Sequence, residues 1–309
     1  MNDPSEQTTT AASWWMIGAM SVVCLFLTAD LGFRVRPASV LPLATGLILL
    51  IAGIVIGART ARPRLVLGAT AFLQMTLFTV IGVVLAYALA ARAGPLWDDT
   101  FTAWDRRLGF DWPATFAAAD RSPILLWVGG LAYHSLTLQM IVAIVVLSAT
   151  ERADTLRTAA AAAILGGFAT IAVSGVVPAL GNVFDPASYH ILWPSVAWIE
   201  RDMILGLRDG SWRVIDLTQL MGIVSFPSYH ATLPVILAWA QRDVRGWRFV
   251  APTWAGVTII ATPVFGGHYG VDVIAGLAMA VVALAVAPAL VRWKAPAREN
   301  PRTTASHAG

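Results

Sequence analysis

The chain has 309 residues, of which 57% are hydrophobic and only 13% are charged. Its mean hydropathy of +0.69 is far above that of an average water-soluble domain and predicts an integral membrane protein. The net charge of +3 does not indicate a nucleic-acid partner, because Lys and Arg are scattered between apolar segments instead of forming one stripe.

The ends of the chain differ from its interior. Residues 1–12 and 295–309 are predicted to be disordered tails, the second of them cytoplasmic, on either side of a single membrane-embedded domain, residues 13–294. The first twelve residues include Asp3 and Glu6 but no Lys or Arg, which is the wrong charge for the start of a secretory signal peptide. Cys24 is the only cysteine, which excludes an internal disulfide and a cysteine-built metal site.

Apolar runs recur along the chain, most of them near the ~20 residues that a helix needs to cross a membrane. The predicted fold is therefore all-α, a polytopic transmembrane helical bundle. We expect eight segments, at residues 14–33, 38–58, 65–91, 123–149, 158–179, 219–241, 249–266 and 271–292. Because eight is an even number, both termini should lie on the same side of the membrane.

The basic residues between these segments indicate the orientation. Twelve Lys and Arg fall on the side of the termini and nine on the other side, where they are diluted over two long loops. The positive-inside rule therefore places the termini in the cytoplasm and both long loops outside.

Both long loops are rich in tryptophan and aspartate. Residues 94–122 contain three Trp and five Asp, and residues 180–217 contain three Trp together with five acidic residues. This mixture is typical of amphipathic helices at a membrane interface, where indole rings sit at the level of the headgroups. We expect interfacial helices that cover the same outer face.

Two histidines lie beside apolar segments, in FPSYH (226–230) and in GGHYGVDV (266–273). The 38 positions between His230 and His268 accommodate two antiparallel membrane passes of ~17 residues each and a short turn. This hairpin predicts that the two imidazoles lie at the same level, in the outer leaflet. Ionisable groups at such depths are costly and therefore count as functional candidates.

The residues around the histidines suggest a site for an anion. Pro227 and Ser228 are typical of a helix start, where free N–H groups favour phosphate. The two glycines before His268 leave room for a ligand to approach the backbone. Asp272 follows His268 by four residues, so that on one helical face it can accept the imidazole N–H.

The sequences FPSYH and GHYGVDV resemble the second and third signature motifs of the type 2 phosphatidic acid phosphatase superfamily. They look closest to its inositol phosphorylceramide synthase-like branch, in which H-Y-x-x-D-V is the typical form. The resemblance covers about residues 180–292. It implies a six-helix phosphatase-like core, a nucleophilic His268 that becomes phosphorylated, an Asp272 that orients it, and a His230 that serves as acid and base.

The same resemblance implies the reaction. A membrane phospholipid or another lipid phosphate would donate the group, and a lipid, a polyol or water would accept it. The motif form favours headgroup transfer in the inositolphosphotransferase manner, with a lipid phosphate or polyprenyl diphosphate phosphatase as the alternative. No cofactor and no metal are implied, since a carboxylate cluster that would suit magnesium is missing from this set of residues. The expected location is a bacterial inner membrane, with the site facing the periplasm.

The sequence departs from the phosphatase pattern at the residues that hold phosphate. Ala261 and Thr262 occupy the positions of the usual Ser-Arg pair, and the lysine that begins the first motif has no counterpart, since Lys294 is the only lysine. We expect Arg208 and Arg213 in LRDGSWR to bind the phosphate instead. Ser228 could contact the phosphate, cap the helix, or do both.

Other interpretations stay open. A proton-coupled transporter would use the two histidines and Asp272 as a relay, and a noncatalytic assembly protein would not need them. Within the fourth segment, His134 and Gln139 could line a substrate cavity, but the pattern favours hydrogen-bonded helix contacts for them.

Overall fold

The computed structural model describes residues 11–92 and 94–292. The predicted C-terminal tail, 295–309, lies outside the described residues, and so do residues 1–10 of the predicted N-terminal tail. Its last two residues, Ala11 and Ala12, belong to a helix, so that tail is shorter than predicted. In chain order the α-helices are α2 (Ala11–Asp30), α3 (Val40–Arg59), α4 (Pro63–Arg92), α5 (Asp98–Arg107), α6 (Trp112–Asp120), α7 (Pro123–His134), α8 (Leu136–Ala149), α9 (Ala153–Val176), α10 (Val196–Asp209), α11 (Tyr229–Gln241), α12 (Trp247–Gly266) and α13 (Gly270–Arg292).

The prediction of an all-α polytopic bundle is confirmed. Among the described residues, six helices are long and apolar enough to cross a membrane, and the pair α7–α8, bent by 55°, makes a seventh span if it is counted as one. Each of the eight predicted apolar segments overlaps one of these spans, counting α7–α8 as one, or α11, which has 13 residues. The long loops hold α5, α6 and α10, as expected of amphipathic outer helices.

The apolar segment predicted at residues 219–241 is helical only in part. Helix α11 begins at Tyr229 with Ser228 at its N-cap position, as predicted from Pro227 and Ser228, whereas residues 219–228 form turns and irregular backbone. This stretch is apolar because it is buried: Leu220, Ile223 and Val224 pack into the main hydrophobic core. The hydroxyl of Tyr87 accepts a hydrogen bond from the backbone N–H of Met221 (2.9 Å) and donates one to its carbonyl (3.0 Å), replacing the bonds of a helix.

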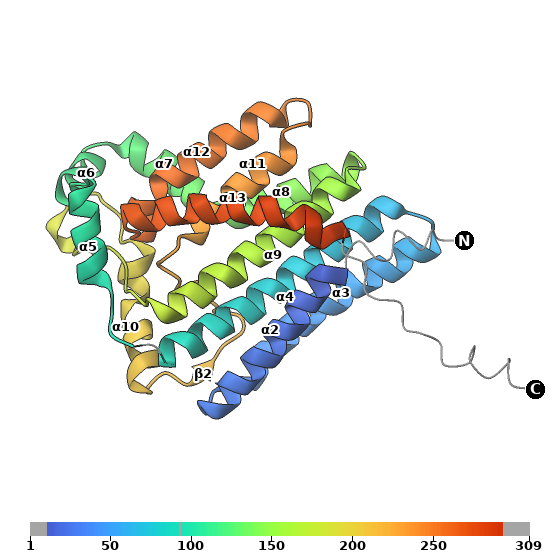
Figure 1. The fold of residues 1–309 in the computed structure, drawn as a ribbon, viewed down its shortest axis with the longest axis horizontal. Helices are drawn as coiled ribbons and strands as arrows, with labels where there is room; N and C mark the ends of the chain where they lie inside the picture. The colour runs from blue at the N-terminus through green and yellow to red at the C-terminus, as the bar shows by residue number, and fades with distance from the viewer. Residues whose placement is uncertain (1–10, 93, 293–309) are drawn as a thin grey trace, which may run out of the picture.

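The helices pack around α9 and α4, which lie next to each other near the middle of the bundle (Figure 1). On one side α2 and α3 pack against α4, and on the other α13 and α11 pack against α9. Helix α9 is enclosed on every side at the five consecutive buried alanines Ala159–Ala163, whose small side chains allow close helix approach. Gly276 of α13 likewise admits the backbone of α11, since a Cβ there would collide with the carbonyl oxygen of Ser228.

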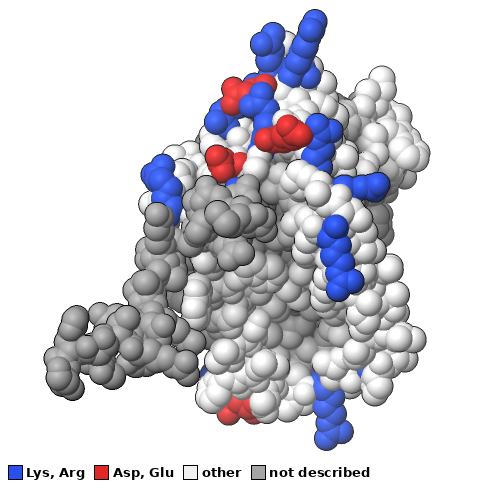
Figure 2. Space-filling model, turned by 90° about the vertical axis from the view of Figure 1, so that its right-hand side faces the viewer, with Lys and Arg blue, Asp and Glu red and all other residues white. Residues whose placement is uncertain are grey.

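The two described ends of the chain, the start of α2 and the end of α13, lie toward the same side of the bundle, as an even number of segments requires (Figure 1). Figure 2 looks onto that side, where blue basic side chains outnumber red acidic ones. The connections α3–α4, α8–α9 and α11–α12 turn back here, and they carry the arginines predicted to face the cytoplasm. Helices α5, α6 and α10 gather at the opposite end.

A short parallel ladder joins the loop after α2 to the loop after α10. Strand β1 (Arg34–Val35) pairs with β2 (Val214–Ile215), and η1 (Pro37–Ser39) leads on into α3. An ion pair of 2.7 Å between Arg36 and Asp216 extends the connection. A second single turn, η2 (Pro186–Ser188), lies between α9 and α10.

Candidate active site

The centre of the site is a buried contact between His268 and Asp272. Nδ1 of His268 lies 3.3 Å from Oδ2 of Asp272, four residues further along the chain. His268 follows the end of α12, and Asp272 is in the first turn of α13, where a negative charge is also favoured by the helix dipole. When Nδ1 carries the proton and donates a hydrogen bond to the carboxylate, the lone pair is on Nε2, so the ring can act as a nucleophile through Nε2.

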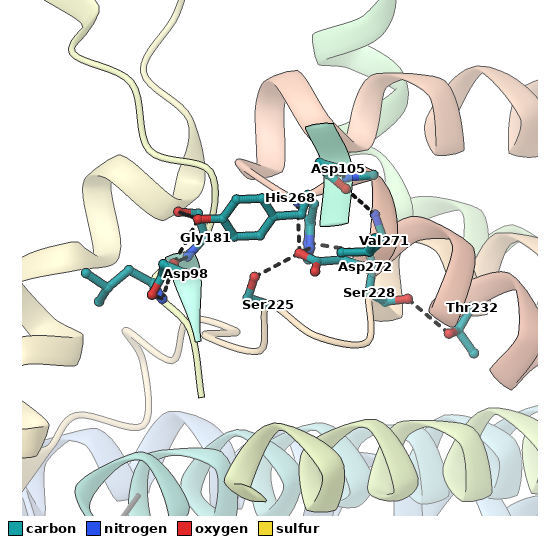
Figure 3. A network of polar contacts seen from close by, with 12 residues as sticks. Asp98, Asp105, Gly181, Ser225, Ser228, Thr232, His268, Val271 and Asp272 are labelled. Atoms are coloured by element: carbon teal, nitrogen blue, oxygen red, sulfur yellow. Dashed lines mark hydrogen bonds and ion pairs between the residues drawn. The ribbon is translucent and has the colours of Figure 1, made fainter. Parts of the chain in front are cut away.

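Further groups hold the Asp272 carboxylate in place. Its Oδ2 accepts hydrogen bonds from the hydroxyl of Ser225 and from the backbone N–H of Tyr269, both at 2.9 Å. Asp272 is fully buried, with an exposed fraction of 0%. Figure 3 shows Ser225 reaching the aspartate from the irregular stretch before α11. The shape of that stretch, which the sequence did not reveal, therefore bears directly on the site.

His230 lies in the first turn of α11, near His268. Its ring is 6.3 Å from that of His268, measured between centroids, and stacks on Tyr133 at 4.3 Å with an interplanar angle of 14°. Reacting atoms must come within ~3–3.5 Å of their partners. The separation of the rings is therefore compatible with a phosphorus atom placed between them.

Ser228 faces His268 and not its own helix. It precedes α11 in the N-cap position, but its side chain makes no capping hydrogen bond, which corrects the capping interpretation. Its Oγ lies 3.4 Å from Nε2 of His268, and its backbone N–H donates to the carbonyl of Asp272. The residue is fully buried. A contact of this hydroxyl with phosphate stays a prediction.

The glycine before His268 is needed for packing and for backbone conformation. Gly267 ends α12 in the left-handed region, at φ +73°, which favours a residue without a side chain. A Cβ at this position would collide with Ala197 and Ser195 at the start of α10. We expected the glycines to admit a ligand, but at Gly267 the space is occupied by α10.

Asp105 of α5 was missed by the sequence analysis. Its Oδ2 accepts hydrogen bonds from the backbone N–H of Gly270 and from the indole of Trp112, both at 2.7 Å, and its Oδ1 accepts one from Val271 at 2.9 Å. Asp105 is fully buried and caps the N-terminus of α13 from another helix (Figure 3). It thereby fixes the turn between His268 and Asp272.

Asp98, also on α5, makes hydrogen bonds to residues on either side of the site. Its carboxylate accepts hydrogen bonds from the backbone N–H groups of Leu180 and Gly181 and from the hydroxyl of Tyr269, which follows His268. Figure 3 shows this second connection between α5 and the site. In the sequence, these aspartates look like ordinary acidic residues of a Trp-rich loop, with no local signal of their role.

A cavity of about 350 Å³ adjoins His230. It is lined mostly by apolar residues of α4, α8, α9, α11 and the stretch 220–224. Its polar lining includes Tyr133, His134, Glu200 and His230, whereas His268 is not part of its wall. His134 thus lines the cavity, against our expectation. Gln139 makes the expected helix contact, a 3.0 Å hydrogen bond to Thr258 of α12.

Arg208 and Arg213 lie at the C-terminal end of α10 and just beyond it. The guanidinium of Arg208 donates to the carbonyl of Gly94 at 2.7 Å. That of Arg213 donates to the carbonyl of Leu207 at 2.7 Å and lies over the ring of Phe33. The other end of α10 touches Gly267, ~18 Å away along the helix axis at 1.5 Å per residue. Among the described contacts, none joins either arginine to the histidines, and their role in binding substrate stays a prediction.

Comparison with known families agrees with this geometry. A family model described as the PAP2 superfamily matches residues 99–286, well over half of the chain. The match begins in α5 and ends within α13, so it includes Asp105, His230 and His268. The searches of curated proteins and of solved structures found no match. The chain belongs to the PAP2 superfamily, whose members are phosphatases and phosphotransferases.

Proposed function

We propose that this protein is a membrane enzyme that moves a phosphoryl or phosphodiester headgroup from a lipid donor through a covalent phosphohistidine at His268. One observation carries the proposal: Asp272 contacts Nδ1 of His268, which leaves the lone pair on Nε2, and the ring of His230 lies 6.3 Å away, a separation that suits a phosphorus atom between the two rings. The PAP2 match supports an enzyme over a transporter or an assembly protein.

In the first step, Nε2 of His268 attacks phosphorus while the bond to the leaving alcohol oxygen breaks. Asp272 stabilises the positive charge that develops on the imidazole. Protonated His230 gives its proton to the leaving oxygen, which would otherwise depart as an alkoxide. The products of this step are the phosphorylated His268 and a free alcohol, and His230 is left neutral.

In the second step, neutral His230 takes a proton from an acceptor hydroxyl. The acceptor oxygen attacks phosphorus and the P–N bond breaks, which returns His268 to its starting state. Water as acceptor gives hydrolysis, whereas an alcohol gives transfer. The motif sequence HYGVDV favours headgroup transfer in the manner of inositol phosphorylceramide synthases. Hydrolysis of a lipid phosphate or polyprenyl diphosphate is the alternative.

The transferring phosphoryl group needs donors, because electrostatic stabilisation supplies most of the catalysis in such reactions. Of the proposed phosphate donors, Ser228 is the nearest to His268, since its hydroxyl lies beside Nε2 of that residue. Arg208 and Arg213 would have to leave their present carbonyl partners to reach the phosphate. We retain all three as proposed substrate-binding residues.

The proposed location is a bacterial inner membrane, with the site on the periplasmic side. The excess of basic side chains at the end opposite the histidines supports this orientation (Figure 2). Helices α5, α6 and α10 would then lie at the outer interface.

Turnover in detergent tests the proposal. Purified protein is incubated with phosphatidic acid or phosphatidylinositol, with and without a free alcohol acceptor, and released phosphate and transferred headgroup are measured. We expect turnover that is lost in His268→Ala and kept in His190→Ala, which removes an imidazole from an outer loop. Equal turnover by His268→Ala and the parent protein would exclude the proposed reaction.

A further inference from the structure

The cavity next to His230 has a defined position relative to the reacting atoms. An in-line displacement places the attacking and leaving groups on opposite sides of phosphorus. If His268 attacks from one side, the alcohol oxygen that exchanges a proton with His230 is on the other. Because His230 lines the cavity and His268 does not, the cavity lies on the side of the alcohol.

The lining of this cavity suits part of a lipid. Most of its residues are aliphatic or aromatic, from Met75 and Phe78 of α4 to Leu233 of α11. Its volume of about 350 Å³ falls at the small end of ligand pockets, which measure ~300–1,000 Å³. The cavity therefore fits the part of a lipid alcohol nearest to its reacting oxygen, with the remaining chain outside.

Glu200 places an acidic side chain in this mostly apolar lining. It lies on the buried face of α10 with an exposed fraction of 4%, and it is part of the cavity wall. Among the described residues its carboxyl group has no hydrogen-bond or ion-pair partner, in contrast to Asp98, Asp105 and Asp272. The oxygens of Glu200 are not among the fully enclosed unpaired polar atoms of the described residues; they open onto the cavity, where they can meet a ligand.

The chemistry of the ligand follows from the state of the carboxyl group. Burial raises the pKa of Glu200 to about 8, so the group is mostly protonated at neutral pH. A protonated carboxyl donates one hydrogen bond and accepts others, which suits a hydroxyl group and not an ammonium ion. A neutral Glu200 also avoids repelling the phosphate beside His230.

We propose that Glu200 determines specificity by binding a second hydroxyl group of the lipid alcohol whose reacting oxygen lies at His230. This inference rests on the proposed function, because it is the proposed reaction that places the alcohol, and not the nucleophile, on the side of phosphorus where the cavity lies. The lipid would carry two neighbouring polar groups, one that reacts and one that Glu200 recognises, above an apolar chain that follows α4 and α11.

Equilibrium binding tests this inference without turnover. The probes are monodecanoylglycerol, with two neighbouring hydroxyls, and 3-hydroxypropyl decanoate, which lacks the second one. A third probe, 2-amino-3-hydroxypropyl decanoate, has an ammonium group in its place. The full-length protein in detergent should bind the first probe about three- to ten-fold more tightly than the second, as expected for one hydrogen bond between neutral groups.

Variants of two acidic residues of α10 complete the test. Glu200→Leu should reduce the ratio of the two dissociation constants to about one, whereas Glu200→Gln, which keeps a donor and an acceptor, should preserve most of it. Asp202→Leu is the matched control, since Asp202 is on the same helix with its side chain 84% exposed, and it should keep the full ratio.

The inference would be overturned by a ratio near one in the parent protein, by no binding of either probe, or by a ratio that Glu200→Leu leaves unchanged. Preference for the ammonium probe that Glu200→Gln abolishes would overturn it too, since it would require an ionised carboxylate. If Glu200→Leu does not fold, Glu200→Ala takes its place, because it also removes the carboxyl group and should likewise reduce the ratio to about one. Failure of the reaction itself shows separately, as turnover that survives in His268→Ala.

Discussion

The carboxylate of Asp105 caps the helix that carries Asp272, with 2.7 Å between its Oδ2 and the backbone nitrogen of Gly270. The two residues belong to elements far apart in the chain, α5 and α13, and both are fully buried. A helix outside the transmembrane bundle therefore fixes the start of α13, and with it the distance between His268 and Asp272.

Substitution of Asp105 should impair catalysis more than substrate binding. Asp105→Ala leaves three donors unpaired, one buried and two partly buried, at up to ~1–3 kcal/mol each, and should lower both Tm and kcat. Asp105→Asn keeps one acceptor oxygen and should recover part of kcat, with KM close to that of the parent protein. A purely structural role would reduce the amount of folded enzyme without changing kcat per active site, which titration of active sites distinguishes.

Asp111→Asn is the control for that experiment. Asp111 caps α6 through its own side chain on the exposed surface of the same loop, accepting from the N–H of Ala114. Asparagine is as good an N-cap as aspartate, so Tm and kcat should stay at the parent values.

Gly276→Ala should destabilise the protein by ~1–3 kcal/mol, the usual cost of overpacking, because the new methyl group would press against the carbonyl oxygen of Ser228. Gly256→Ala is the matched control, since Gly256 lies inside α12 with open space around its Cα. There the change should be neutral or stabilise by ~0.4–1 kcal/mol. Thermal unfolding in detergent measures both, and equal Tm values for the two variants would contradict the packing described for α11 and α13.

The raised pKa of Glu200 predicts how stability depends on pH. The folded protein holds this proton up to a pH of about 8, whereas the ordinary pKa of a glutamate side chain is 4.5. The folded state thus binds more protons in this window, and stability should fall as pH rises from 4.5 to 8. Tyr133, His134 and His230 also line the cavity, so the comparison with Glu200→Gln isolates the carboxyl group.

The parent protein should therefore lose more Tm between pH 6 and 8.5 than Glu200→Gln does. Parallel curves for the two proteins would show that Glu200 does not titrate between these limits.

The sequence was sufficient to predict the parts of the site that depend on local spacing. The four-residue interval between His268 and Asp272 and the length of the α11–α12 hairpin both follow from helix geometry. The eight apolar segments likewise follow from the thickness of a membrane. These features depend on regular structure, in which position along the chain determines position in space.

The remaining parts depend on contacts between distant segments. Asp105 is 165 positions away from Gly270, and Ser225 reaches Asp272 from an irregular stretch whose hydrophobicity looked like part of a helix. Glu200 has no motif around it, and only the fold shows that its face of α10 is buried. Such contacts arise from tertiary packing, which neither periodicity nor local motifs encode.

The most direct test of the account is to trap the covalent intermediate. Protein is mixed with phosphatidic acid labelled with ³²P, quenched in base, in which phosphohistidine survives, and digested for mass spectrometry. We predict a phosphoryl group on His268 that is absent from His268→Ala. In His230→Ala it should form more slowly and also decay more slowly, because that variant lacks both the acid of the first step and the base of the second. Label on another residue, or turnover with no labelled His268 at any time point, would contradict the account.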